Sequence, residues 1–92
     1  MTSRTLTILN ESGLHQRPAG MFAERASKFR SRVTVSNGKQ AVDGKCVLSL
    51  MLLGAAPGAR ITITTDGEDE AEALAALASL LEKPGTEYSF PI

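Results

Sequence analysis

The sequence predicts an α+β fold of two layers, in which helices gathered on one face cover an antiparallel sheet. Two observations indicate this fold. Four segments carry apolar residues on one face only, with the period of a half-buried strand. Three other segments carry apolar residues with helical spacing or in a short run between glycines. The expected order is strand, helix, strand, strand, helix, strand, helix. A chain of 92 residues has room for one compact core and not for two, so we expect a single domain over residues 1–92.

The first and last strands show the alternation most clearly. The letters TLTI at positions 5–8 alternate polar and apolar side chains, which predicts a strand over residues 3–9. The letters RITITT at positions 60–65 alternate again and predict a fourth strand, with Ile61 and Ile63 pointing inward. Each strand then has one apolar face, as expected for an antiparallel sheet with one side covered.

The two middle strands are expected to form a hairpin. Residues 33–35 and 40–42 are short strand-like segments on either side of Asn37 and Gly38. An Asn-Gly pair favours a type I′ turn, because both central residues of that turn need a positive φ. We therefore expect a tight turn with Asn37 and Gly38 at its tip.

Two amphipathic helices are expected over residues 16–29 and 68–82, where apolar residues follow an i, i+3, i+4, i+7 spacing. The apolar residues of the first are Ala19, Phe22, Ala23, Ala26 and Phe29, and those of the second are Ala71, Leu74, Leu77, Ala78 and Leu81. The acidic residues 68–70 favour the start of the second helix, and the letters KPG at 83–85 end it.

The tail after this helix, residues 84–92, has no usable period. Docking of Tyr88 and Phe90 on the sheet edge is one alternative. We expect instead that the tail is peripheral or frays, as chain ends commonly do.

The segment CVLSLMLLG at 46–54 has one polar side chain and is open to two interpretations. One is a short helix with an exposed apolar face, and the other is a fully buried strand or helix, because a continuous apolar run does not distinguish them. Gly44 and Gly54 favour the short, bounded helix. In that helix Leu50 and Leu53 point inward with Val47 at the boundary, and Leu48, Met51 and Leu52 lie near water. Exposed apolar clusters of this kind usually mark a binding surface.

Composition and charge exclude several classes of protein. The formal net charge is zero, which argues against general nucleic-acid binding, although cations outnumber acids in residues 1–50 and acids outnumber cations in residues 51–92. This asymmetry fits either a basic face for acidic partners or two differently solvated surfaces. No run of 18 apolar residues is present, so we expect no membrane insertion. The N-terminus does not resemble a signal peptide, and the lone Cys46 favours a reducing cytoplasm.

Metal and hydrolase chemistry are also poorly supported. The single histidine, His15, and the single cysteine, Cys46, show no metal-ligand spacing, and we expect neither a metal nor a cofactor. A chain this short leaves little room for a hydrolase cleft. Gly38 and Lys39 lack the rest of a P-loop, and we interpret them as part of the hairpin turn.

The letters GLHQRPAG at 13–20 hold His15 at the expected start of the first helix. If this helix begins near Gln16, the free backbone N–H groups of its first turn point towards anything attached to the His15 ring. Pro18 suits a first turn, and Arg17 supplies a permanent cation that can bind phosphate oxygens in pairs. The helix start and Arg17 both favour a neutral, nucleophilic imidazole. The alternative is a solvated surface histidine beside an arginine.

Four stretches together resemble one known family. These are GLHQRPAG at 13–20, SNGK at 36–39, GKCVLSLMLLGA at 44–55 and GARITITTDGEDEAEAL at 58–74. They resemble the histidine-containing phosphocarrier (HPr) family of the bacterial phosphoenolpyruvate-dependent phosphotransferase system, and the match is collinear over about residues 3–82. The resemblance implies an open-faced β-sandwich with four antiparallel strands and three helices on one side.

The resemblance also implies roles for single residues. His15 is expected to accept a phosphoryl group on Nδ1 from phosphorylated enzyme I and to pass it to IIA domains for sugar uptake, with Arg17 as its electrostatic partner. The residues expected to shape this site are Ser12, Gly13, Gln16, Pro18 and Gly20. The residues expected to form the apolar docking patch are Val47, Leu48, Met51 and Leu52. Such a protein is a monomeric, stoichiometric phosphohistidine carrier rather than a stand-alone enzyme. The alternative is a regulatory member of a nitrogen-type branch that binds partners according to its phosphorylation state.

The sequence departs from the family at several positions. Where a kinase-regulated branch has a serine, this chain has Cys46, so we expect no regulatory serine, and Ser49 lies almost a turn further on. Cys46 is expected to be a small packing residue, the alternative being a redox-active thiol in the first turn of a helix. Gln16 is larger than usual and Glu24 is acidic where the family is often basic or neutral, which could alter partner choice.

Overall fold

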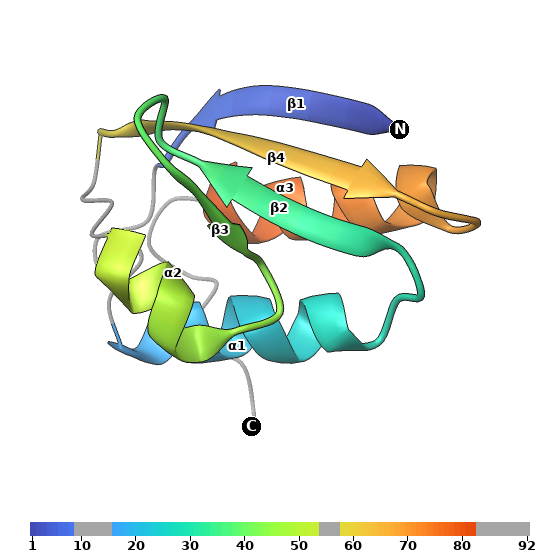
Figure 1. Cartoon of the computed structure of the whole chain (residues 1–92), viewed down its shortest axis with the longest axis horizontal. Helices are drawn as coiled ribbons and strands as arrows, with labels where there is room; N and C mark the ends of the chain where they lie inside the picture. The colour runs from blue at the N-terminus through green and yellow to red at the C-terminus, as the bar shows by residue number, and fades with distance from the viewer. Residues whose placement is uncertain (9–15, 54–57, 83–92) are drawn as a thin grey trace.

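A computed structural model describes residues 1–8, 16–53 and 58–82 of the chain (Figure 1). The elements are β1 (Thr2–Thr7), α1 (Gln16–Ser27), β2 (Arg32–Ser36), β3 (Ala41–Asp43), α2 (Val47–Leu53), β4 (Arg60–Asp66) and α3 (Glu70–Glu82). Their order confirms the predicted one. The predicted ending of the last helix at 83–85 and the tail at 84–92 lie outside the described residues.

The four strands form one antiparallel sheet in the order β1-β4-β2-β3. The first strand of the chain therefore lies beside the last one, and β4 joins β1 to the β2–β3 hairpin. Figure 1 shows the three helices on the same side of this sheet, with α1 against both α2 and α3. The predicted α+β fold, an open-faced β-sandwich, is confirmed.

The core lies between the sheet and the helices because each strand turns its apolar residues to the same side. The buried strand residues include Leu6, Val33, Val35, Ile61 and Ile63, as the alternation predicts. The opposite face of the sheet carries hydroxyls, such as the Thr5 and Thr62 side chains, whose oxygens lie 2.8 Å apart. Burying one large aliphatic side chain contributes about 1.5–3 kcal/mol, so this one-sided pattern sets which face the helices cover.

The helices differ from prediction at their ends. α1 ends at Ser27, two positions early, where the Ser27 hydroxyl donates to the Ala23 carbonyl at 2.8 Å and the chain turns. Phe29 therefore lies beyond the helix and is half-buried. In α3, Ala71 is exposed, which contradicts its predicted core position, and Ala73 and Leu80 are buried instead. The helix starts two positions later than expected, and Leu77, Ala78 and Leu81 are buried as predicted, so the inward face is the predicted one, widened to include Ala73 and Leu80.

The hairpin between β2 and β3 is confirmed, but the predicted type I′ turn is wrong. Gly38 has a φ of +93°, whereas no described residue other than glycine has a positive φ, so Asn37 does not. The connection spans residues 37–40. The Asn37 side-chain oxygen accepts hydrogen bonds from the backbone N–H groups of Lys39 at 2.8 Å and Gln40 at 2.9 Å. The side chain of Asn37 thus organises a longer loop without adopting a left-handed backbone.

Candidate functional site

The start of α1 follows directly on the motif that the sequence singles out. The helix begins at Gln16, as predicted, and Arg17 and Pro18 lie in its first turn. The first backbone N–H groups of a helix have no partner within it, and they make this end electropositive. His15 itself, Ser12, Gly13 and the side chains of residues 16–18 lie outside the described residues. The described backbone therefore fixes where the helix starts relative to His15.

Gly20 lies inside α1, where glycine costs about 0.5–1 kcal/mol relative to alanine. A Cβ atom built on Gly20 would meet no described atom within 4 Å. Packing within the described part of the chain therefore does not require a glycine at this position.

The short helix α2 buries one face and exposes the other. Leu50 and Leu53 are buried. The exposed apolar side chains, here called the α2 patch, are Val47 (40% exposed), Leu48 (65%), Met51 (38%) and Leu52 (72%). The i, i+1, i+4, i+5 spacing puts these four on one side of the helix. The prediction of a short helix with an exposed apolar face is confirmed, and the alternative of a fully buried segment is wrong.

The turn before α2 is fixed by a close approach to β2. The Gly44 N–H donates to the Val33 carbonyl at 2.8 Å, and a Cβ atom on Gly44 would lie 2.5 Å from a methyl group of Val33. The Asp43 side chain accepts a hydrogen bond from the Lys45 N–H at 2.9 Å. Only glycine fits at position 44, and the turn therefore holds the start of α2 at a defined distance from the sheet.

Cys46 occupies the cap position of α2, because its carbonyl accepts a hydrogen bond from the Leu50 N–H at 3.1 Å. The residue is half-buried. Hydrogen bonds from the Ser49 hydroxyl and from the Ser49 N–H lower the pKa of the Cys46 thiol, against the opposing effects of burial and of Asp43. The Ser49 hydroxyl is thus engaged with the thiol.

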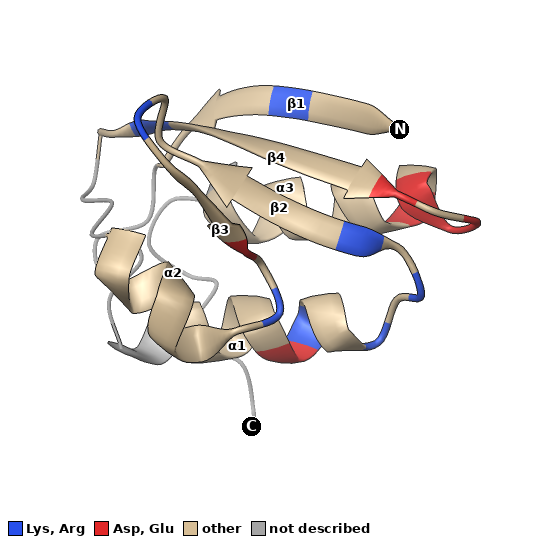
Figure 2. Cartoon of the chain, in the orientation of Figure 1, with Lys and Arg blue, Asp and Glu red and all other residues tan. Residues whose placement is uncertain are grey.

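The α2 patch and the start of α1 lie on the same side of the molecule. The two helices contact each other, and Figure 1 shows the pale blue first turn of α1 at the same end of the fold as α2. Figure 2 shows that α2 carries no charged residue, whereas acidic residues gather where β4 meets α3. Glu24 is exposed on α1. The cations of the first half of the chain lie on β1, α1, β2, the hairpin, the α1–β2 connection and the turn before α2.

Two further findings concern what the described residues contain. They include no group of three or more His, Cys, Asp or Glu side chains placed to hold a metal ion. No helix among them is both long and apolar enough to cross a membrane.

Comparisons with known proteins agree with this arrangement. Residues 2–83 match the family described as "PTS HPr component phosphorylation site". The phosphocarrier protein HPr of Neisseria meningitidis serogroup A is 43% identical over 81 residues, which cover 88% of this chain and 91% of that protein. The chain belongs to the HPr family. As a phosphocarrier of the phosphotransferase system, an HPr works with the proteins of that system.

Solved HPr structures share the fold. HPr-C-His from Thermoanaerobacter tengcongensis superposes with a TM-score of 0.88 at 35% identity, covering 100% of both chains. An HPr dimer from the same organism superposes with a TM-score of 0.70 at 39% identity, covering 89% of this chain and 94% of that one. Structures of HPr proteins thus include a dimer, and the prediction of a monomer stays a prediction for this chain.

Proposed function

We propose that His15 is the phosphorylated residue of this HPr. Its Nδ1 atom accepts a phosphoryl group from phosphorylated enzyme I and passes it to IIA domains for sugar uptake. The observation that carries the proposal is the start of α1 at Gln16, directly after His15 and on the same side of the fold as the α2 patch. The membership of the chain in the HPr family supports it.

In each transfer the Nδ1 lone pair attacks phosphorus while the bond between phosphorus and the donor breaks. The attacking ring is neutral with its proton on Nε2, so no base on this chain has to remove a proton first. The start of α1 and Arg17 favour this neutral form, because both oppose a further positive charge on the ring. No oxidation or reduction takes place, and the phosphoryl group leaves in the same way when a IIA domain accepts it.

After transfer the same groups face a phosphoryl group with two negative charges, on a ring that keeps its Nε2 proton and carries one positive charge. An exposed helix start contributes about 0.3–1 kcal/mol to binding an anion, and Arg17 adds a cation that keeps its proton. This stabilisation is modest, which suits a carrier that must release its phosphoryl group. The chain supplies one nucleophile and a docking face, and its partners supply the remaining catalytic groups.

The α2 patch is proposed as the surface that enzyme I and the IIA domains contact. Four large apolar side chains are between 38% and 72% exposed there. Exposed apolar clusters of this kind usually mark a surface that contacts another protein. No charged residue interrupts them within α2. We further propose that the protein acts as a monomer in the cytoplasm and that, with Cys46 in place of a regulatory serine, an HPr kinase does not modify it.

The test is phosphorylation with phosphoenolpyruvate and the cognate enzyme I. The protein is expected to gain one acid-labile phosphoryl group, and His15→Ala is expected to abolish it. Glu72→Gln, which changes an exposed residue of α3 outside α1 and the α2 patch, serves as a control that should still be labelled. Labelling that survives His15→Ala would contradict the proposal.

The labelled protein is then offered to a panel of IIA domains. Transfer to a sugar-specific IIA domain supports a role in sugar uptake. Labelling of His15 without transfer to any sugar-specific IIA domain would contradict that role and favour the regulatory, nitrogen-type alternative.

A further inference from the structure

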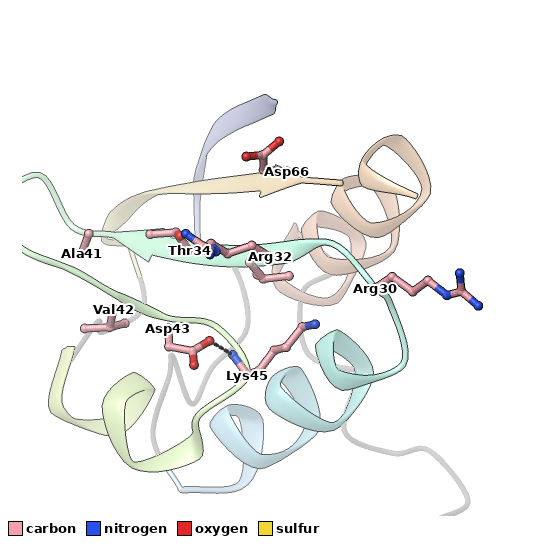
Figure 3. A pocket seen from close by; sticks show the side chains of 9 residues that line it. Arg30, Arg32, Thr34, Ala41, Val42, Asp43, Lys45 and Asp66 are labelled. Atoms are coloured by element: carbon pink, nitrogen blue, oxygen red, sulfur yellow. Dashed lines mark hydrogen bonds between the residues drawn. The ribbon is translucent and has the colours of Figure 1, made fainter. Parts of the chain in front are cut away.

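Lys45 links the start of α2 to the end of α1. It lies in the turn between β3 and α2, where its N–H donates to the Asp43 carboxylate at 2.9 Å, the dashed line in Figure 3. Its ammonium group donates to the Phe29 carbonyl at 2.8 Å. Figure 3 shows the side chain pointing away from α2 and towards the connection that carries Arg30, beside an open pocket of about 850 Å³. One residue therefore bonds to both segments.

The Phe29 carbonyl lies where a cation is favourable. α1 ends at Ser27, and the Phe29 N–H donates back to the Ala26 carbonyl at 3.1 Å. Phe29 thus follows closely on the C-terminal end of the helix, where backbone carbonyls carry a partial negative charge. A hydrogen bond from an ammonium group is stronger than one between neutral groups. Lys45 is half-buried, so solvent screens this bond less than it screens an exposed pair.

The helix α2 depends on such an attachment because it is short. It has seven residues, and helices shorter than about 12–15 residues are marginal on their own. Its buried residues are Leu50 at its middle and Leu53 at its end, whereas its first turn contributes exposed side chains to the α2 patch. The orientation of this first turn is therefore set by the residues before it. There Gly44 packs against β2 and Lys45 bonds to the end of α1.

We propose that Lys45 is a positioning residue for the docking of partners. By holding the first turn of α2 against the end of α1, it keeps the α2 patch in the orientation that enzyme I binds. This rests on the proposed function, in which the α2 patch contacts enzyme I. Without the bond to Phe29 the first turn adopts other orientations, and the apparent affinity falls with the fraction of molecules that keep the competent one.

The test is phosphorylation with phosphoenolpyruvate and enzyme I, in which the concentration of this protein is varied to give KM and kcat. Lys45→Met removes the donor and keeps an unbranched side chain. Its KM is expected to rise about three- to tenfold, the population shift that follows the loss of one charge-assisted hydrogen bond. Its kcat should not change, because His15 is not altered. Lys45→Arg keeps a cation with N–H donors and is expected to restore the KM of the wild type.

Lys39→Met is the matched control. It also replaces a lysine by methionine and removes one positive charge, but Lys39 is exposed in the hairpin between β2 and β3. This variant should keep the KM of the wild type.

Amide hydrogen exchange in the free protein is the second measurement. The Leu50 N–H donates to the Cys46 carbonyl at 3.1 Å and reports on the first turn of α2, whereas the amide of the buried Leu77 in α3 reports on general unfolding. Lys45→Met is expected to speed exchange more at Leu50 than at Leu77. Equal acceleration at both amides would show a general loss of stability and would overturn the proposal.

The double variant of Leu48→Ala and Leu52→Ala, assayed alongside, separates this proposal from the proposed function. If the double variant keeps the KM of the wild type, the α2 patch is not the docking surface and both proposals fail. If the double variant raises KM and Lys45→Met does not, the positioning role alone fails. A raised KM in Lys45→Met without faster exchange at Leu50 would also overturn it, because Lys45 would then act by contacting enzyme I directly.

Discussion

Asp69 joins two parts of the chain that lie far apart in sequence. It caps α3, since its carbonyl accepts the Ala73 N–H at 2.9 Å, while its side chain binds the N–H groups of Arg30 and Ser31 and the Ser31 hydroxyl. Ser31 is fully buried, and a Cβ atom on Gly67 would lie 2.7 Å from its Cα atom. One carboxylate therefore fixes the connection between α1 and β2 against the start of α3.

These hydrogen bonds make the stability of the protein depend on pH. The Ser31 hydroxyl and then the Arg30 N–H lower the pKa of Asp69 from 3.8 to about 2. A carboxylate with a lowered pKa stabilises the fold above its unfolded pKa, and that contribution is lost as the pH falls from about 4 to about 2. Asp69→Asn is expected to lower the urea midpoint at pH 7, and the difference from wild type should shrink over this range.

Urea unfolding at pH 7, 4 and 2.5 measures this effect. Glu68→Gln is the control, because the exposed pair of Glu68 with Arg30 should contribute little at any of these values. A difference between wild type and Asp69→Asn that stays constant with pH would show that the charge of Asp69 is not what stabilises the connection.

The sequence predicted the start of α3 but not the contacts of the Asp69 side chain. Acidic residues at 68–70 predicted a helix start, because negative charge is favourable there. The partner of the Asp69 side chain lies 38 positions earlier, at Ser31, and no local pattern points to a contact of that range. For the same reason the sequence could not show that the helix would begin at Glu70 rather than at 68.

Among the elements, α2 was predicted most fully. The eight nearly all-apolar positions 46–53 cannot all be buried by two helical turns in a small domain, and this argument gave both the buried and the exposed residues. The C-terminal end of α1 and the turn of the hairpin were not predicted as well. Both depend on hydrogen bonds between a side chain, of Ser27 or Asn37, and the nearby backbone. Such bonds compete with the backbone hydrogen bonds of regular secondary structure.

Replacing Leu48 and Leu52 with alanine tests whether the α2 patch binds partners. These two side chains are the most exposed of the patch, so the double variant should weaken binding to enzyme I, measured by calorimetry. It should change the free energy of unfolding by about 0.5 kcal/mol or less, as surface substitutions usually do.

Leu50→Ala in the same helix is the matched control. Leu50 is fully buried, so its truncation is expected to cost about 2–5 kcal/mol of stability. If the double variant unfolds as readily as Leu50→Ala and binds enzyme I normally when folded, the patch is part of the core and not a docking surface.

At the scale of the whole molecule, the sheet and the helices share one hydrophobic core. Ile63 from β4, Phe22 from α1 and Leu77 from α3 are all fully buried within it. The one-sided patterns of strands and helices predicted that the core would lie between these two layers. They could not predict which strands are neighbours, because alternation fixes the face of a strand and not its place in the sheet.

A shared core predicts that the protein unfolds as one domain. Urea unfolding followed by circular dichroism and by the loss of amide protection in β2 and α3 should give coincident transitions. Ile63→Ala and Leu77→Ala should lower both transitions together. Separate midpoints for the sheet and the helices would contradict a single cooperative unit.

The strand order also has a consequence for synthesis. Among the described strands, β1 pairs with β4 alone, and Leu6 lies opposite Ile61. A chain growing on the ribosome makes β1 first and cannot give it a partner until β4 has emerged, whereas the β2–β3 hairpin can close much earlier. When β4 arrives, it pairs with both β1 and β2 and completes the sheet. The last of the described strands to be made therefore joins two separate pieces into one sheet, which α3 then covers.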